Sequence, residues 1–111
     1  MMTIADIRAR KGKRKITMLT AYDFPTASLL DQAGIDIILV GDSLAHVVLG
    51  LESTTQVGMQ EMIHHAKAVT RAVRNAFVVG DMPFESYQVH PEECVQNARR
   101  FIEEAHCAAV K

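Results

Sequence analysis

The chain has 111 residues, of which 49% are hydrophobic and 23% are charged, and its formal net charge is -1. That length suffices for one domain with its own core, so we predict a single domain over residues 1–111. The near-neutral charge argues against nucleic acid or an anionic membrane surface as a partner. No apolar run approaches the roughly 20 residues of a transmembrane helix, and the N-terminus does not resemble a signal peptide. With no disulfide or zinc spacing between Cys94 and Cys107, we expect a reduced, cytoplasmic protein.

Helix and strand signals alternate along the chain. Thr3 and Asp6 can form a capping box at the start of a short first helix. Asp23 can cap a second helix, with Pro25 in its first turn and Gly34 just past its end. The other predicted elements are a helix from Met59 that Asn75 ends, a helix from Pro91 to Ala105, and strands at 16–20, 35–40, 77–79 and 108–111.

The order of these elements determines the predicted fold class. Helices separate successive strands and no hairpin turn occurs, which demands right-handed crossovers and a parallel sheet. No glycine-rich phosphate-binding turn follows the first strand. We therefore predict an α/β protein that is the N-terminal portion, about four strands, of a (β/α)8 TIM barrel. Residues 108–111 look like the beginning of a strand, which predicts a truncated barrel with exposed strand edges.

Two predicted strands end in the same pattern, a glycine followed by an aspartate at Asp42 and at Asp81. A single aspartate after a strand is more often a turn or capping residue than a ligand. Two of them on neighbouring parallel strands should meet at one edge of the sheet, where they would repel each other. Such a pair favours a shared proton or a bound cation. Because the ligands are hard oxygens with no His/Cys cluster, Mg²⁺ is the expected cation.

Three further residues are candidates at the same edge. Ser43 could donate a hydrogen bond to a substrate carboxylate, or merely cap the segment after the strand. Lys111, at the end of the fourth predicted strand, could lie along an anionic substrate or simply be solvated. Asp23 leaves the first strand on this side, and its simpler role is that of helix cap.

Five stretches together resemble one enzyme family. They are Thr20-Ala21-Tyr22-Asp23, Val40-Gly41-Asp42-Ser43-Leu44, Glu52-Ser53-Thr54-Thr55, Gly80-Asp81-Met82-Pro83-Phe84 and Ala109-Val110-Lys111. In this order and at these separations the chain is similar to the ketopantoate hydroxymethyltransferases. The resemblance implies a Mg²⁺-dependent barrel enzyme of pantothenate biosynthesis. That family transfers the one-carbon unit of 5,10-methylenetetrahydrofolate to 3-methyl-2-oxobutanoate, giving 2-dehydropantoate.

The resemblance also implies roles for four residues. By position, Asp42 and Asp81 match the metal carboxylates of the family, and Ser43 and Lys111 match its contacts to the oxo acid. A divalent ion chelated by the keto and carboxylate oxygens acidifies C3–H and stabilises an enolate, which attacks the methylene carbon. The family's general base and its third metal-site group fall beyond residue 111. We therefore expect this chain alone to be poorly folded or oligomer-dependent and nearly inactive. The resemblance also implies a homo-oligomer.

One departure and two alternatives accompany this resemblance. His106 stands where the family usually has a helix-ending glycine, which weakens the local cap. A barrel enzyme of the phosphoenolpyruvate-mutase or isocitrate-lyase type would also enolise an oxo acid on Mg²⁺, but it would not use folate. A non-catalytic fragment would use its apolar faces only for assembly with another chain.

Overall fold

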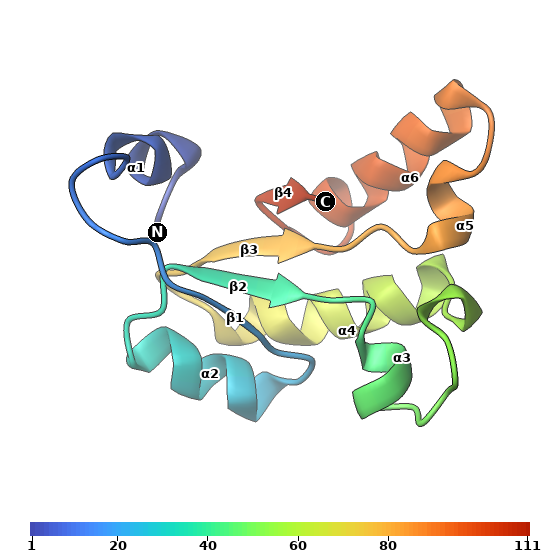
Figure 1. Cartoon of the computed structure of the whole chain (residues 1–111), viewed down its shortest axis with the longest axis horizontal. Coiled ribbons are helices and arrows are strands. Elements are labelled where there is room, and N and C mark those ends of the chain that lie inside the picture. Colours follow the sequence, from blue (N-terminus) through green and yellow to red (C-terminus); the bar gives the residue numbers. More distant parts are fainter.

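The computed structural model describes all of residues 1–111 and has four parallel strands at its centre (Figure 1). The strands pair in the order β1-β2-β3-β4, and helices join them in sequence. The predicted α/β fold class, part of a TIM barrel, is therefore confirmed. The elements are α1 (Ile4–Ala9), β1 (Met18–Thr20), α2 (Phe24–Gln32), β2 (Ile37–Val40), α3 (Leu44–Val47), the 3-10 helix η1 (Thr54–Gln56), α4 (Met59–Ala72), β3 (Phe77–Gly80), α5 (Phe84–Tyr87), α6 (Pro91–Glu103) and β4 (Ala109–Val110).

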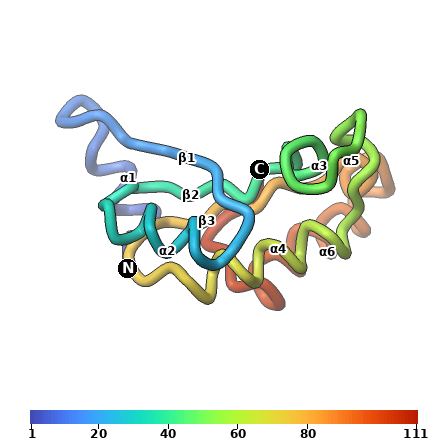
Figure 2. Tube along the Cα trace, turned by 90° about the horizontal axis from the view of Figure 1, so that it is seen from below, coloured from blue at the N-terminus to red at the C-terminus, as the bar shows by residue number.

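The hydrophobic core lies between the strands and the three long helices α2, α4 and α6, which Figure 2 shows on one side of the strands. Alternate residues of β2 and β3, namely Ile38, Val40 and Val78, belong to this core. Phe101 of α6 is fully buried there and lies directly over Gly80, where a Cβ would overlap its ring. Gly80 therefore allows α6 to pack closely against β3.

The edges of the sheet are more open than its centre. Strands β1 and β4 each pair on one side only, and Met18 and Leu19 of β1 remain 43% and 50% exposed. Such uncovered edges are what the sequence predicts for part of a barrel. No helix of the chain has both the length and the apolar character needed to cross a bilayer.

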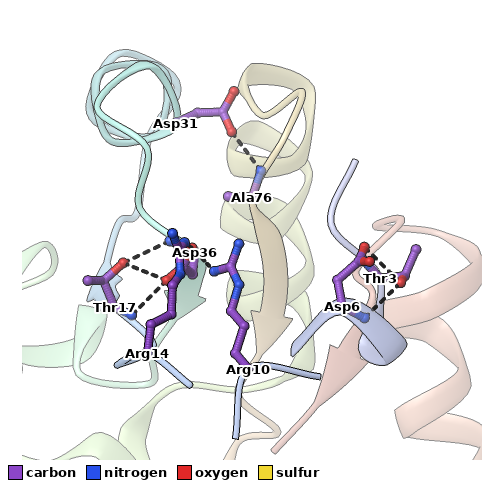
Figure 3. Close-up of polar contacts among 8 residues, drawn as sticks. All are labelled: Thr3, Asp6, Arg10, Arg14, Thr17, Asp31, Asp36 and Ala76. Atoms are coloured by element: carbon purple, nitrogen blue, oxygen red, sulfur yellow. Dashed lines mark hydrogen bonds and ion pairs between the residues drawn. The ribbon is translucent and has the colours of Figure 1, made fainter. Parts of the chain in front are cut away.

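Asp36 ties α1 and the residues that follow it to the beginning of β2 (Figure 3). Its carboxylate accepts the backbone N–H of Thr17 at 2.9 Å and the Thr17 hydroxyl at 3.1 Å. The guanidinium groups of Arg10 and Arg14 donate to the same carboxylate. Strands β1 and β2 each begin two residues later than predicted, at Met18 and Ile37.

The stability that Asp36 contributes should depend on acidic pH. The backbone N–H of Thr17 and then the Arg10 guanidinium lower the pKa of Asp36 to about 2, from an ordinary value of 3.8. A lowered pKa adds stability above pH ~4, and this stability is lost as the pH falls towards 2. The difference corresponds to about 2 kcal/mol. Urea unfolding between pH 5 and 2.5 should show a smaller loss of stability in Asp36→Asn than in the unmodified chain. Parallel pH profiles for the two chains would contradict this assignment.

Asp31 of α2 ends α4. Its carboxylate accepts three successive backbone N–H groups, those of Arg74 at 2.9 Å, Asn75 at 3.0 Å and Ala76 at 2.8 Å. These groups donate to a side chain rather than to helix carbonyls, so α4 ends at Ala72 and the predicted end at Asn75 is wrong. Burial alone would raise the pKa of Asp31, but the three N–H donors outweigh it and lower the pKa.

His106 adopts the left-handed backbone conformation that its place after α6 requires, with φ of 58°. The turn is closed by the N–H of Cys107, which donates to the carbonyl of Phe101 at 2.9 Å. A side chain with a Cβ is strained in this region of backbone space, whereas glycine is not. The prediction that this position calls for glycine is consistent with the observed conformation.

We expect His106→Gly to raise the free energy of unfolding by about 0.5–1 kcal/mol, because the strain is relieved at the expense of a more flexible unfolded chain. His106→Ala keeps the Cβ and is the matched control, for which no gain is expected. Urea midpoints of the three chains measure this. An equal gain from alanine would show that the imidazole, not the backbone, is responsible.

Candidate active site

The carboxyl ends of β2, β3 and β4 place four side chains at one end of the sheet. The parallel ladder continues past the strands, since the N–H of Asp81 donates to the Val40 carbonyl at 3.0 Å and that of Lys111 to the Gly80 carbonyl at 3.0 Å. Asp42 and Ser43 follow Val40 directly, so all four residues lie at the same end of the sheet, where the strands have their carboxyl ends. We call Asp42, Ser43, Asp81 and Lys111 the rim cluster.

Asp81 is the centre of the rim cluster and is 5% exposed. One carboxylate oxygen, Oδ2, accepts the backbone N–H of Asp42 at 3.0 Å. The other, Oδ1, accepts the Nζ of Lys111 at 2.9 Å. Asp42 and Asp81 are therefore in contact through the backbone N–H of Asp42, and Lys111 is the ion-pair partner of Asp81.

Burial and neighbouring charges disfavour the ionised form of Asp42. Burial raises the pKa of Asp42, and repulsion from Asp81 raises it further, while Lys111 offsets part of this effect. The hydrogen bond to Asp81 raises the pKa of Lys111, so the lysine stays charged. Lys111 thus balances one of the two negative charges. The negative charge of Asp42 remains unfavourable at its position beside Asp81. An added cation would relieve that repulsion.

The donor set fits part of a magnesium shell. Asp42 and Asp81 supply carboxylate oxygens, which are the hard oxygen ligands that Mg²⁺ prefers. No group of three or more His, Cys, Asp or Glu side chains in the chain is placed to hold a metal ion. Mg²⁺ is commonly held by one or two carboxylates, with water and substrate filling the remaining positions.

Ser43 is held by a contact that the sequence analysis did not foresee. It occupies the position before α3 but its side chain caps nothing, so the capping alternative is wrong. Its Oγ instead lies 2.7 Å from the hydroxyl of Tyr22, which follows β1. The available signal was the stretch Thr20-Ala21-Tyr22, which leaves a neighbouring strand at the same end of the sheet. By contrast, Asp23 caps α2 as predicted, accepting the N–H of Thr26 at 2.8 Å.

The sequence predicts no helix or strand between Asp42 and Val57, yet this segment contains two short helices. They are α3 and η1, and Ser53 and Gln56 form a capping box at η1. The imidazole Nδ1 of His46 lies 3.0 Å from the Leu51 carbonyl and holds the turn after α3. In Figure 1 α3 lies just past the tip of the β2 arrow.

A separate hollow of about 650 Å³ lies near α5 and α6, lined in part by Met59, Phe84, Glu85, Asn97 and Arg100. No residue of the rim cluster lines it. The candidate site is therefore defined by converging charges at the strand ends rather than by this hollow.

Comparison with known families and sequences gives a consistent picture. A family model described as ketopantoate hydroxymethyltransferase matches residues 1–111. The 3-methyl-2-oxobutanoate hydroxymethyltransferase of Syntrophobacter fumaroxidans is 58% identical over 110 residues, covering 99% of this chain and 39% of that protein. The enzyme of the same name from Thermoanaerobacter sp. is 62% identical over 102 residues, covering 92% of this chain and 37% of that protein. The chain spans about two fifths of the length of the curated relatives it matches.

Solved structures resemble this chain in fold. Phosphoenolpyruvate phosphomutase from Streptomyces platensis subsp. rosaceus superposes with a TM-score of 0.73 at 24% identity, over 98% of this chain and 37% of that one. A 2,3-dimethylmalate lyase, a member of the PEP mutase/isocitrate lyase superfamily, gives a TM-score of 0.70 at 19% identity, over 99% and 37%. At these identities the similarity is one of fold alone.

Proposed function

Because this chain belongs to the ketopantoate hydroxymethyltransferase family, we propose that it provides the oxo-acid side of a hydroxymethyltransferase site. The reaction is transfer of the one-carbon unit of 5,10-methylenetetrahydrofolate to 3-methyl-2-oxobutanoate, giving 2-dehydropantoate. The observation that carries the proposal is the convergence of Asp42 and Asp81 with Lys111 at one end of the sheet. The chain spans about two fifths of the length of its relatives. We therefore propose the activity for a protein that contains this chain and not for these 111 residues alone.

In this proposal Asp42 and Asp81 hold Mg²⁺. The raised pKa of Asp42 beside Asp81 supports this assignment, because a divalent cation removes the repulsion that causes part of the shift. When bound, the ion would chelate the oxo acid and stabilise negative charge on its enolised form. We assign no general base to the rim cluster.

The chain's own residues then bind and orient the substrate. Lys111 places an ammonium group beside Asp81, where it can also approach a substrate carboxylate. The side chain of Lys111 is 65% exposed, so it remains accessible to a ligand. Ser43, the residue after Asp42, offers a hydroxyl. The cluster therefore has one cationic and one neutral donor for an anionic oxo acid.

Two further expectations complete the proposal. The substrates are small molecules, and we place the reaction in the cytoplasm. We also propose that the chain acts within a homo-oligomer, which is supported by the apolar side chains that stay exposed on β1 and after α3. The mutase or lyase alternative has only the shared fold in its support, and no residue contact favours it.

The proposal is tested by titrating 3-methyl-2-oxobutanoate into the isotopically labelled chain, with and without Mg²⁺, and following amide NMR signals. We expect Mg²⁺ alone to shift the signals of Asp42 and Asp81, and the oxo acid to shift that of Ser43 only when Mg²⁺ is also present. In parallel, protein containing this chain is assayed for folate-dependent formation of 2-dehydropantoate. Shifts confined to other parts of the chain, or identical shifts without Mg²⁺, would contradict the proposed site.

A further inference from the structure

The side chain of Ser43 is confined from two directions. On one side its Oγ lies 2.7 Å from the hydroxyl oxygen of Tyr22. On the other side it lies above the Cα of Gly41, where an added Cβ would come within 2.9 Å of the Oγ. A Cβ at position 41 would force the Ser43 Oγ to move, so Gly41 permits this orientation of Ser43. The serine hydroxyl is thus placed by its neighbours and not by helix capping.

Tyr22 is itself held at a defined position. The preceding residue, Ala21, continues the ladder, because its N–H donates to the Leu39 carbonyl at 3.1 Å. The carbonyl of Tyr22 lies 2.8 Å from Nδ1 of His65 on α4, so this nitrogen carries the proton and donates. The following residue, Asp23, caps α2. Contacts from β2, α2 and α4 therefore fix the point from which the phenol reaches Ser43.

The hydrogen bond between the two hydroxyls has a direction that depends on the ligand. A serine hydroxyl has one proton, and an anionic carboxylate can only accept. If Ser43 donates to the substrate carboxylate, its proton is no longer available to Tyr22, so the tyrosine must donate to the Ser43 Oγ. In the opposite arrangement Ser43 would present only lone pairs to an anion, which is repulsive.

We propose that Tyr22 is a positioning residue, whose hydroxyl donates to Ser43 Oγ and so directs the serine proton towards the carboxylate of the bound oxo acid. Gly41 is the second part of this device, since it provides the space in which the Oγ sits. The inference rests on the proposed function for the identity of the acceptor. It adds Tyr22, Gly41 and the anchoring His65 to the residues that determine how the substrate is oriented.

The test combines two substitutions in the full chain. Tyr22→Phe keeps the ring and removes the hydroxyl, Ser43→Ala removes the Oγ, and a third chain carries both changes. The first measurement needs no ligand: the three-bond Hα–Hβ couplings of Ser43 report its rotamer. We expect one staggered rotamer in the unmodified chain and averaged couplings in Tyr22→Phe.

The second measurement is the affinity for 3-methyl-2-oxobutanoate in the presence of Mg²⁺. We expect Tyr22→Phe to weaken binding about threefold to tenfold, and Ser43→Ala about tenfold or more, as for hydrogen bonds to a charged group. Tyr22→Phe should add no further loss when Ser43 is already alanine, whereas a purely structural role would lower affinity equally in both backgrounds. Thr26→Val, which removes an exposed hydroxyl from the same segment, is the control and should change neither measurement.

Unchanged Ser43 couplings in Tyr22→Phe, or equal losses of affinity in both backgrounds, would overturn the inference. If folded protein that contains this chain binds no oxo acid in the presence of Mg²⁺, the proposed function fails. The couplings, which are measured without ligand, still decide whether Tyr22 orients Ser43.

Discussion

Replacing Asp81 by asparagine is expected to weaken the Mg²⁺-dependent binding of 3-methyl-2-oxobutanoate by about 100-fold or more. Asp81 is the residue that joins the rim cluster, since one oxygen accepts the Asp42 N–H and the other the Lys111 ammonium. The amide oxygen of asparagine can still accept one of these bonds, so the local shape is retained. The negative charge is lost, and with it one of two anionic ligands and the partner of Lys111.

The experiment is a calorimetric titration of Mg²⁺ and oxo acid into the unmodified chain, Asp81→Asn and Asp42→Asn. Asp23→Asn is a matched control, because it removes a carboxylate at the same end of the sheet and asparagine also caps helices well. Urea unfolding of each variant verifies that the chain is folded. The same binding heat in Asp81→Asn would refute the proposed metal site. A chain that serves only assembly would show no metal-dependent signal in any variant, which separates that alternative.

Replacing Asp31 by alanine is expected to lower the free energy of unfolding by about 3 kcal/mol or more, because three backbone N–H groups lose their acceptor at once. Asp31 is only 7% exposed. The donors are the N–H groups of residues 74–76, which link α4 to β3. Loss of their acceptor should therefore loosen the start of β3, the strand that Asp81 directly follows.

Asp31→Asn separates charge from hydrogen bonding. One amide oxygen can still accept from the 74–76 turn, so we expect a smaller loss of about 1–2 kcal/mol. Gln32→Ala, at the exposed neighbouring position, is the control and should change stability by less than about 0.5 kcal/mol. Chemical unfolding curves provide the comparison, and hydrogen exchange at Ala76 provides a local one. Equal stability of the alanine variant and the unmodified chain would show that the turn holds without the carboxylate.

Much of the candidate site follows from local sequence pattern. A buried strand followed by glycine and aspartate occurs twice, and parallel strands bring such positions to one edge of the sheet. This reasoning places Asp42 beside Asp81, as observed. It does not reveal that Lys111 bonds Asp81 or that Tyr22 bonds Ser43, because those contacts join residues 30 and 21 positions apart. Their existence depends on how far each strand extends and on which way each side chain turns.

The roles of the buried carboxylates near the beginnings of the strands cannot be predicted from the local sequence pattern. Asp31 lies within an ordinary helical pattern and Asp36 directly before a strand, and neither position signals a partner in the sequence. Only packing of α2 against the end of α4 brings the carboxylate of Asp31 to three free N–H groups. Similarly, Asp36 meets Arg10 and Thr17 only when α1 folds back to the start of β2 (Figure 3).

By itself, then, the sequence determined the alternation of helices and strands, the helix caps at Thr3 and Asp23, and the edge of the sheet at which acidic residues gather. These features depend on periodicity and on hydrogen bonds between residues three or four positions apart, which a linear pattern records. The tertiary structure alone decided which charges pair, where α4 ends and how Ser43 is oriented. Each of these outcomes requires two distant segments to meet at hydrogen-bonding distance, and that is a property of packing rather than of any single stretch of chain.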